Sequence, residues 1–428
     1  MLPGRKMIVI FFVISIGLFA LSYYPAQTAV NATLTFTVNS NVDLPDFATN
    51  GVCSVGHETN GLCTLRAAIT EARGNAHEQP VTVRIPPGTY TLTIPPDPDI
   101  AEDYRHGDLD INPNSPTNHL ITIEPTVVGG EVIIQTALDF HDRILEIGNA
   151  NVYIEGVVFS GAHLVIDPYQ LGGGAIMNSG TLKLVRTKFA NNTVSCKPLT
   201  DCTSNVIGGA IRNSGTLSIV DSSFVQNSAD RGSAIFTNGP SVDILNSSFL
   251  QNSTITINNW SEVSILNSTL SGGEYALVND GDLSLQSCTL LNFSQTIRND
   301  PGKTVWVSDS IFVTHGQELF KDYGGIWTSG GYNIFGDVSW PGSYATGDLY
   351  NTDPKLGILG NYGGPTFTHP LQQGSPAIDH RPGNCEENST PLSEDQRHFP
   401  RNDGKCDTGA FEHTGVFYVP LFLPAIFR

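Results

Sequence analysis

The stretch Ala175–Leu182, which reads AIMNSGTL, recurs almost unchanged as AIRNSGTL at Ala210–Leu217. Weaker copies of this stretch begin at Ala234, Thr256, Ala276 and Thr296. Each copy leads into a second strand-like piece that ends in a large apolar residue: Phe189, Phe224, Phe249, Leu270, Leu290 and Phe312, with Phe159 ending an earlier copy. From Phe189 onward, successive ends lie 35, 25, 21, 20 and 22 residues apart. A period of about 20 residues that tolerates insertions predicts one coil of a β-solenoid per repeat.

The strands of each coil are expected to be short, because apolar and polar residues alternate over only a few positions, as in Thr181–Leu184. Leucine-rich repeats have a similar period, but their L-x-x-L-x-L skeleton is absent here. We therefore predict an all-β fold, a right-handed parallel β-helix of the pectin-lyase-like kind, with its repeats at 151–315. Each coil buries its inner side only against its neighbours, so both ends need caps.

Stacked coils place equivalent residues above one another, which predicts two columns of polar side chains. The first column consists of small residues two positions before each apolar end: Thr187, Ser222, Ser247, Ser268, Cys288 and Ser310. Cys288 is then a buried free thiol in a serine-sized slot, rather than a reactive nucleophile. The second column is Asn178, Asn213, Asn259, Asn279 and Asn299, whose amides can bond their own turns and one another. Both columns are predicted to be structural.

Composition narrows the class of protein. Hydrophobic residues make up 39% of the 428 residues, which is enough to bury a core, so wholesale disorder is disfavoured. The formal net charge of −19 opposes a nucleic-acid partner. We expect a monomer whose partner is an extracellular polysaccharide or another surface molecule.

Both termini carry apolar stretches. Arg5 and Lys6 precede the apolar run Met7–Leu21, and Val30 and Ala32 form a candidate cleavage pair. Residues 1–32 are therefore predicted to be a secretory signal peptide, with an uncleaved anchor as the alternative. The apolar tail at 414–428 is either a sorting or anchoring signal or a last strand docked on the fold. Membrane contact is expected only through these two segments.

Cysteine usage agrees with export. Six of the 7 cysteines fall into sequence-local couples that would close loops in an oxidising compartment: Cys53 with Cys63, Cys196 with Cys202, and Cys385 with Cys406. A zinc site is the alternative, and no CxxC or HxxxH spacing accompanies these residues. The sequence thus favours a secreted or cell-surface bacterial protein with three disulfides.

An amphipathic helix is predicted over Cys63–Ala72, CTLRAAITEA, because Leu65, Ala68, Ile69 and Ala72 share one face. Thr64 is its candidate N-cap, and the helix would shield one end of the solenoid within the segment 33–150. This stretch resembles the family of secreted β-helix proteins that open with a Cys-Ser-Leu-Arg-Glu-Ala-Ile motif. Ala67 stands where the family usually has Glu, so we expect weaker capping.

The C-terminal segment 316–413 is predicted to cap the other end of the solenoid, and it carries an ordered series of motifs. They are DPKLG from Asp353, NYGGPT from Asn361, HPL from His369, GSPAID from Gly374, DQR from Asp395 and CDTGAFE from Cys406. The series resembles the choice-of-anchor Q domain that follows β-helices in bacterial surface proteins. That resemblance implies an exported, surface-displayed protein and no particular reaction. Asp379, Asp395, Arg397 and Asp407 are expected to pin turns through bonds to the backbone.

Candidate site residues are few, and we assign no catalytic or cofactor-binding residue. The best acidic cluster is Asp97, Asp99, Glu102, Asp103, Asp108 and Asp110, with Arg105 and His106 among them. Asp103, Asp108 and Asp110 are the candidate ligands for Ca²⁺, the one cofactor considered. No EF-hand or nonapeptide calcium pattern is present, so a solvated acidic loop is the favoured interpretation.

Three functions remain open. The favoured one is adhesion or glycan binding without catalysis, on a long side that includes Trp260 and Trp306. The second is a polysaccharide lyase or glycosidase, since parallel β-helices include both. A groove with three or more carboxylates within a few ångströms would favour this enzyme. The third is a passive structural spacer on the cell surface.

Overall fold

The computed structural model describes residues 33–414 except 57–60, 77, 98–104, 113–118, 169, 199, 203–204, 315–318, 337–339, 388–389 and 403. The predicted signal peptide, the apolar tail from Val416 and the acids Asp99, Glu102 and Asp103 lie outside these residues. No helix among the described residues is long and apolar enough to cross a membrane.

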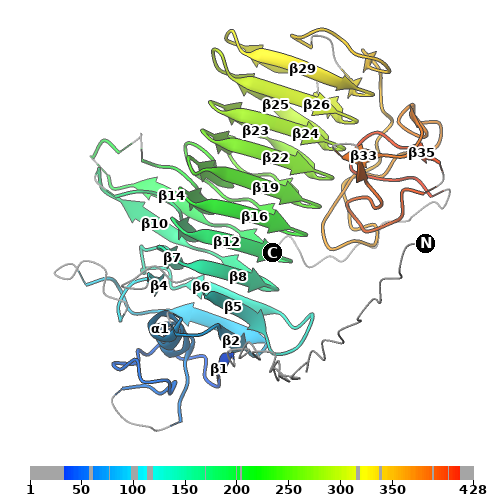
Figure 1. The fold of residues 1–428 in the computed structure, drawn as a ribbon. Helices are drawn as coiled ribbons and strands as arrows, with labels where there is room; N and C mark the ends of the chain where they lie inside the picture. Colours follow the sequence, from blue (N-terminus) through cyan, green and yellow to red (C-terminus); the bar gives the residue numbers. More distant parts are fainter. Residues whose placement is uncertain are drawn as a thin grey trace, which may run out of the picture. The chain divides into compact units, whose positions relative to one another are not determined.

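Each repeat forms three short strands that pair in parallel with the equivalent strands of the coils on either side, so the chain is a right-handed parallel β-helix (Figure 1). Face 1 is an 11-stranded sheet: β1 (Leu34–Thr37), β2 (Val81–Ile85), β5 (Leu120–Pro125), β8 (Asn151–Glu155), β12 (Thr181–Val185), β16 (Thr216–Val220), β19 (Ser241–Leu245), β22 (Glu262–Leu266), β24 (Asp282–Gln286), β26 (Thr304–Ser308) and β29 (Ile326–Gly331).

Faces 2 and 3 are joined by two long strands, β23 (Thr269–Asn279) and β25 (Thr289–Asn299), which run through both faces. Face 2 adds β3 (Gly88–Leu92), β6 (Val132–Thr136), β9 (Val157–Ser160), β13 (Lys188–Ala190), β17 (Ser223–Val225), β20 (Ser248–Leu250), β27 (Ile311–Val313), β30 (Ile334–Phe335) and β31 (Leu349–Tyr350). Face 3 adds β4 (Leu109–Ile111), β7 (Leu145–Ile147), β11 (Ile176–Asn178), β15 (Ile211–Asn213), β18 (Ile235–Thr237), β21 (Ile255–Asn259) and β28 (Phe320–Asp322).

The core is filled by columns of like side chains. Phe159, Phe189, Phe224 and Phe249 stack face to face at centroid separations of 5.1, 4.7 and 4.8 Å. The polar columns lie at the corners of the coils. The amide Nδ2 of Asn259 donates to Asn279 Oδ1 at 2.7 Å, and Nδ2 of Asn279 donates to Asn299 Oδ1 at 2.8 Å. Every member of both predicted columns is buried, and Thr237 takes the place between Asn213 and Asn259.

The corner from face 1 to face 2 is made by a single residue in the left-handed region. Arg186, Asp221, Asn246, Asn267, Ser287 and Asp309 all have φ between 49° and 53°. One such residue turns the chain so sharply that the next residue in sequence is already the member of the small-residue column in that coil. The backbone N–H of Ser222, for example, donates to Ser247 Oγ at 3.1 Å. A further asparagine column, Asn192, Asn227 and Asn252, follows face 2 and was not predicted.

Helix α1 (Leu65–Asn75) packs against β1, β2 and β4 at the N-terminal end of the core. The hydroxyl of Thr64 accepts the N–H of Ala67 at 3.1 Å as the helix cap, and no acidic residue stands in the first turn. At the other end of the core, Trp327 and Trp340 pack edge to face at 5.3 Å. Both indoles are buried, so aromatic side chains close the core there.

Residues 353–413 form a flank segment that lies beside the coils instead of over their end (Figure 1). It contains two short antiparallel pairs, β32 (Arg381–Pro382) with β35 (Lys405–Cys406), and β33 (Glu386–Glu387) with β34 (Thr390–Pro391). Ile311 and Ile334 point outward from face 2 and are buried under Tyr362, Leu371 and Phe411. These apolar residues on the outer side of the coils explain why the segment packs on the flank.

Candidate functional site

Three carboxylates meet on the outer side of face 3, in the first coils. Leu109 and Ile111 of β4 point into the core, so Asp110 between them points outward. The parallel register pairs Asp110 with Glu146 of β7. Asp108 lies just before β4, and one carboxylate oxygen from each of the three residues lies within 4.8 Å of those of the other two. Asp108 and Asp110 are each only 9% exposed.

These carboxylates are poorly paired for groups so deeply buried. Asp108 Oδ2 has no hydrogen-bond partner among the described residues, and the nearest cationic atom is Arg143 Nη1 at 3.8 Å. Arg143 instead donates a hydrogen bond to Glu146. Burial, with the neighbouring acid Asp142, raises the pKa of Asp108 well above its usual range. Burial and the charge of Glu146 raise the pKa of Asp110 to about 7.

The favoured interpretation of this region as a solvated acidic loop is wrong for Asp108 and Asp110. Asp108 and Asp110 are fixed against the core by the coil that follows, which contributes Asp142, Arg143 and Glu146. Asp103, the third Ca²⁺ candidate, lies outside the described residues. The structure thus brings two of the three candidates together and adds Glu146, which the sequence analysis missed because it lies 36 residues beyond Asp110.

The outer side of face 3 continues from Glu146 through Met177 to Arg212, one residue per coil. Arg212 is 9% exposed, and its Nε has no hydrogen-bond partner among the described residues. Its Nη1 reaches Ser214 Oγ at 3.4 Å. Burial and the positive charge of Arg143 lower the pKa of Arg212. No salt bridge to Arg212 is found within the described chain, so no carboxylate of these residues neutralises its charge.

A ridge borders this row of side chains. It consists of β10 (His163–Ile166), β14 (Thr193–Cys196) and the described residues of the loops that follow them, 167–168, 170–174, 197–198, 200–202 and 205–208. It has a small apolar core of its own. The ridge begins beside the carboxylates, because the carbonyl of Leu171 accepts a hydrogen bond from Arg143 Nη2 at 3.2 Å. Gly173 has a φ of 101°, and its backbone lies close to Arg212. A side chain on Gly173 would press on the Cβ atom of Arg212. The ridge therefore contacts this row of side chains at both Arg143 and Arg212.

The donor set fits a hard divalent cation. Ca²⁺ prefers oxygen ligands, and carboxylates are the strongest of these in proteins. Asp108, Asp110 and Glu146 would each supply an oxygen, and the unpartnered Oδ2 of Asp108 would gain a partner. Bound Ca²⁺ would supply positive charge that keeps these buried groups ionised and attracts an anionic ligand.

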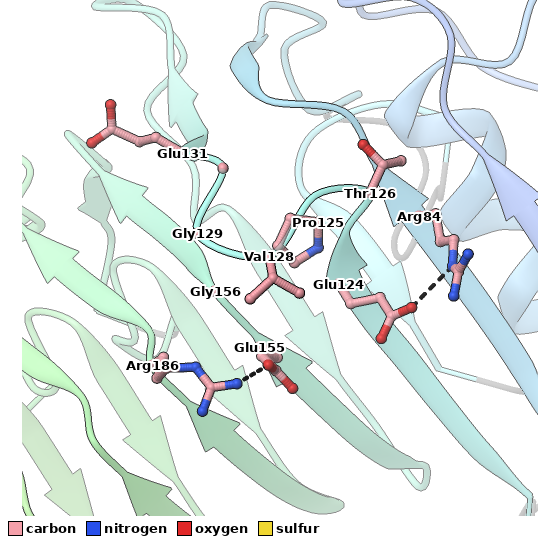
Figure 2. Close-up of a pocket in the computed structure, with 11 residues that line it drawn as sticks. Arg84, Glu124, Pro125, Thr126, Val128, Gly129, Glu131, Glu155, Gly156 and Arg186 are labelled. Carbon is pink, nitrogen blue, oxygen red and sulfur yellow. Dashed lines mark hydrogen bonds and ion pairs between the residues drawn. The ribbon is translucent and has the colours of Figure 1, made fainter. Parts of the chain in front are cut away.

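A cavity of about 540 Å³ lies at the corner between faces 1 and 2 (Figure 2). Charged side chains from successive coils line it, and they pair across the coils: Arg84 Nε bonds Glu124 Oε1 at 3.0 Å, and Arg186 bonds Glu155. Glu155 also accepts the hydroxyl hydrogen of Tyr153 at 2.5 Å. Because each arginine already has a carboxylate partner, this cavity offers less unsatisfied charge than the site on face 3.

The other predicted residues have structural positions. The cysteine couples form three disulfides, Cys53–Cys63, Cys196–Cys202 and Cys385–Cys406, and Cys288 is a buried free thiol. Asp395 accepts the N–H groups of Arg397, Phe399 and Glu412, which pins the turns of the flank segment. Trp260 follows face 3, whereas Trp306 lies in β26 of face 1, so the two indoles do not share a face.

Comparison with known proteins adds a likeness of fold. The crystal structure of the pectate lyase Pel9A superposes with a TM-score of 0.47 at 12% sequence identity, over 89% of this chain and 96% of that chain. No family model matches the sequence, and no curated protein matches it. The resemblances to the Cys-Ser-Leu-Arg-Glu-Ala family and to the choice-of-anchor Q domain therefore stay predictions.

Proposed function

We propose that this protein is an exported, cell-surface glycan-binding protein that holds an acidic polysaccharide on face 3 through a divalent cation. The observation that carries the proposal is the carboxylate cluster of buried Asp108 and Asp110 with partly buried Glu146, in which Asp108 Oδ2 has no hydrogen-bond partner among the described residues. The three disulfides are consistent with an oxidising, extracellular compartment.

The physical argument starts from the cost of burying charge. Carboxylates held this far from water are destabilised unless a cation or a proton neutralises them. Ca²⁺ bound by the three acids leaves coordination positions for a ligand, because calcium takes 6–8 oxygens. A uronate carboxylate fits such a position, and Arg212, two coils from Glu146, can pair with the carboxylate of another sugar unit.

Calcium titration of the full secreted chain tests the cation site. We expect Ca²⁺ to raise the melting temperature, because it binds the folded chain selectively. Asp110→Asn and Glu146→Gln should each weaken calcium binding about tenfold or more, since each removes a charged ligand. Asp243→Asn is the matched control, because Asp243 is an exposed acid on face 1. Equal calorimetric titrations of Asp110→Asn and the parent chain would overturn the cation site.

Glycan binding is tested separately on an array that carries polygalacturonate, alginate and neutral glucans. We expect the acidic polymers to be retained in calcium and released by EDTA. Arg212→Ala should weaken their binding, whereas Asp243→Asn should not. Retention of none of the glycans, in calcium or without it, would leave the passive spacer as the function and contradict glycan binding.

A polysaccharide lyase is the second candidate, and Arg212 is the observation that favours it. Arg212 lies two coils along face 3 from Glu146, and burial lowers the pKa of its guanidinium, which is the direction that a base for β-elimination requires. In that reaction the base removes the C5 proton of a uronate and the C–H electron pair forms the C4=C5 double bond. The C4–O bond breaks, and its electron pair leaves with the oxygen of the departing sugar, which takes a proton from water. Release of unsaturated sugars, detected by ultraviolet absorbance and lost in Arg212→Ala, would establish this activity. Calcium-dependent binding without such release would establish binding alone.

A further inference from the structure

We propose a second sugar-binding site, independent of the cation, at the corner where face 3 turns into face 1. It is made by a corner column of four residues: Trp260, Asp280, Asp300 and Tyr323. The proposal extends the glycan-binding function given above, but it uses other residues and a different class of sugar, neutral pyranose chains.

The four residues occupy equivalent positions in successive coils. Each follows a strand of face 3 directly, and each backbone N–H donates to the carbonyl of the preceding coil: Trp260 to Thr237, Asp280 to Asn259, Asp300 to Asn279 and Tyr323 to Asn299. Neighbouring strands lie about 4.8 Å apart, so the two aromatic residues are about 14 Å apart along the axis. This span suits several sugar rings of a chain that lies parallel to the axis.

The aromatic rings at the two ends of the column are exposed and held in place. The Trp260 side chain is 51% exposed and contacts the ring of Phe236 at a centroid distance of 5.9 Å. Tyr323 is 48% exposed, and the guanidinium of Arg298 lies 5.1 Å from its ring centroid. Large amphipathic rings that are both exposed and anchored form good contact surfaces, because little side-chain entropy is lost on binding.

The two carboxylates between the rings offer hydrogen-bond acceptors, and neither offers a positive charge that would attract an anion. Arg298 donates to both oxygens of Asp300, from Nε at 2.8 Å and from Nη2 at 2.9 Å, which neutralises that carboxylate. Burial and the hydrogen bond to Asp300 raise the pKa of Asp280 to about 6. The pair therefore presents carboxylate acceptors to sugar hydroxyls.

An unsatisfied amide lies beside the column. Asn258 occupies the outer side of β21, between Phe236 and Val278 in the register, and is 1% exposed. Its Oδ1 has no hydrogen-bond partner among the described residues. A polar group left without a partner at such a position is a destabilising feature of the free protein.

Titration calorimetry of the full chain in EDTA tests the proposal, with cellohexaose, xylohexaose and mannohexaose as probes. We expect at least one hexasaccharide to bind, and the matching trisaccharide to bind about tenfold more weakly. Trp260→Ala and Tyr323→Ala should each reduce affinity about tenfold. Tyr350→Ala is the matched control, because Tyr350 is 61% exposed and lies on face 2. Circular dichroism and the melting temperature establish that each variant is folded.

Four outcomes would overturn the second site. Two concern the ligands in EDTA: no neutral hexasaccharide binds, or oligogalacturonate binds more tightly than the neutral probes. Two concern the variants: affinity is unchanged in both aromatic variants, or Tyr350→Ala loses as much affinity as they do. The calcium site is judged apart from this, by Asp110→Asn. Loss of acidic-glycan binding in Asp110→Asn with intact neutral-glycan binding supports both proposals. The reverse pattern, with neutral binding abolished by Asp110→Asn, contradicts the independence of the second site.

Discussion

The imidazole Nε2 of His398 lies 2.9 Å from Asp221 Oδ1, although 177 residues separate the two in sequence. Its Nδ1 lies 3.0 Å from Glu394 Oε2, so the ring bridges two carboxylates. Asp221 stands at a corner of the β-helix with a φ of 53°, and His398 belongs to the flank segment. This contact fastens the flank segment to the coils, and its strength depends on the protonation of one imidazole.

Attachment of the flank segment should therefore depend on pH. Burial opposes the charged imidazole, but the hydrogen bonds that its ring N–H groups donate to Glu394 and Asp221 raise the pKa of His398 above its usual value. A raised pKa stabilises the folded state fully below the unfolded value, and that contribution is lost as the pH rises through the folded value. His398→Gln should lower the free energy of unfolding by up to about 1 kcal/mol near pH 5.5, because the side chain is partly exposed.

The loss in this variant should shrink towards about pH 8.5, because the stabilising charge of the imidazole is lost as the pH rises through its folded pKa. Denaturant titrations at the two pH values measure the difference. His163→Gln, which changes an exposed histidine of β10, serves as control and should shift stability equally at both. A loss in His398→Gln that is the same at both pH values would contradict the charged bridge.

The phenylalanine column should be the most sensitive part of the core. Phe224 stacks between Phe189 and Phe249 with interplanar angles of 8° and 5°, and it is fully buried. Phe224→Ala removes the ring contacts with both neighbouring phenylalanines and leaves a cavity. We therefore expect a loss of about 3–5 kcal/mol in the free energy of unfolding. Urea titration measures it. A loss below about 1 kcal/mol would mean that the neighbouring coils collapse into the space.

The β-helix could be predicted because every coil repeats the same contacts. The residue that stacks on Phe224 from the next coil is the residue that aligns with Phe224 in the repeat. In the same way, alignment of AIMNSGTL with AIRNSGTL gives the register of Ile176 with Ile211. The same argument gives the columns of Asn and Ser side chains. It works only where one coil resembles the next.

The candidate site could not be predicted in the same way, because it lies where the repeat breaks down. Asp110 meets Glu146 across an insertion, and no copy of either residue recurs in the later coils. The ridge that borders Arg212 also comes from insertions, which lengthen the interval between Phe189 and Phe224 to 35 residues. Likewise, the flank segment packs on outward residues such as Ile311, which the repeat pattern does not distinguish from solvent-exposed positions.

The asparagine column should tolerate a hydroxyl better than a methyl group. Asn279 accepts a hydrogen bond from Asn259 and donates to Asn299, so Asn279→Ala leaves buried partners unsatisfied. We expect a loss of about 1–3 kcal/mol. Thr237 already occupies this column and accepts from Asn213 Nδ2 at 3.1 Å, so Asn279→Thr should be less destabilising than Asn279→Ala. Equal losses in urea titrations would contradict a column held by hydrogen bonds.

Cys288 should be replaceable by serine with little effect, although it is fully buried. Its thiol donates to the carbonyl of Gln286 at 3.2 Å, and Ser268 and Ser310 donate the same hydrogen bond at 2.8 Å in the adjacent coils. Cys288→Ser should therefore change the free energy of unfolding by less than about 1 kcal/mol, whereas Cys288→Val should lose about 1–3 kcal/mol because it removes the donor and overfills the slot. Burial raises the pKa of the Cys288 thiol to about 12, so the folded parent chain should not react with a thiol reagent at neutral pH. Rapid labelling of the folded chain, or a large loss in Cys288→Ser, would show that this position is not part of the serine column.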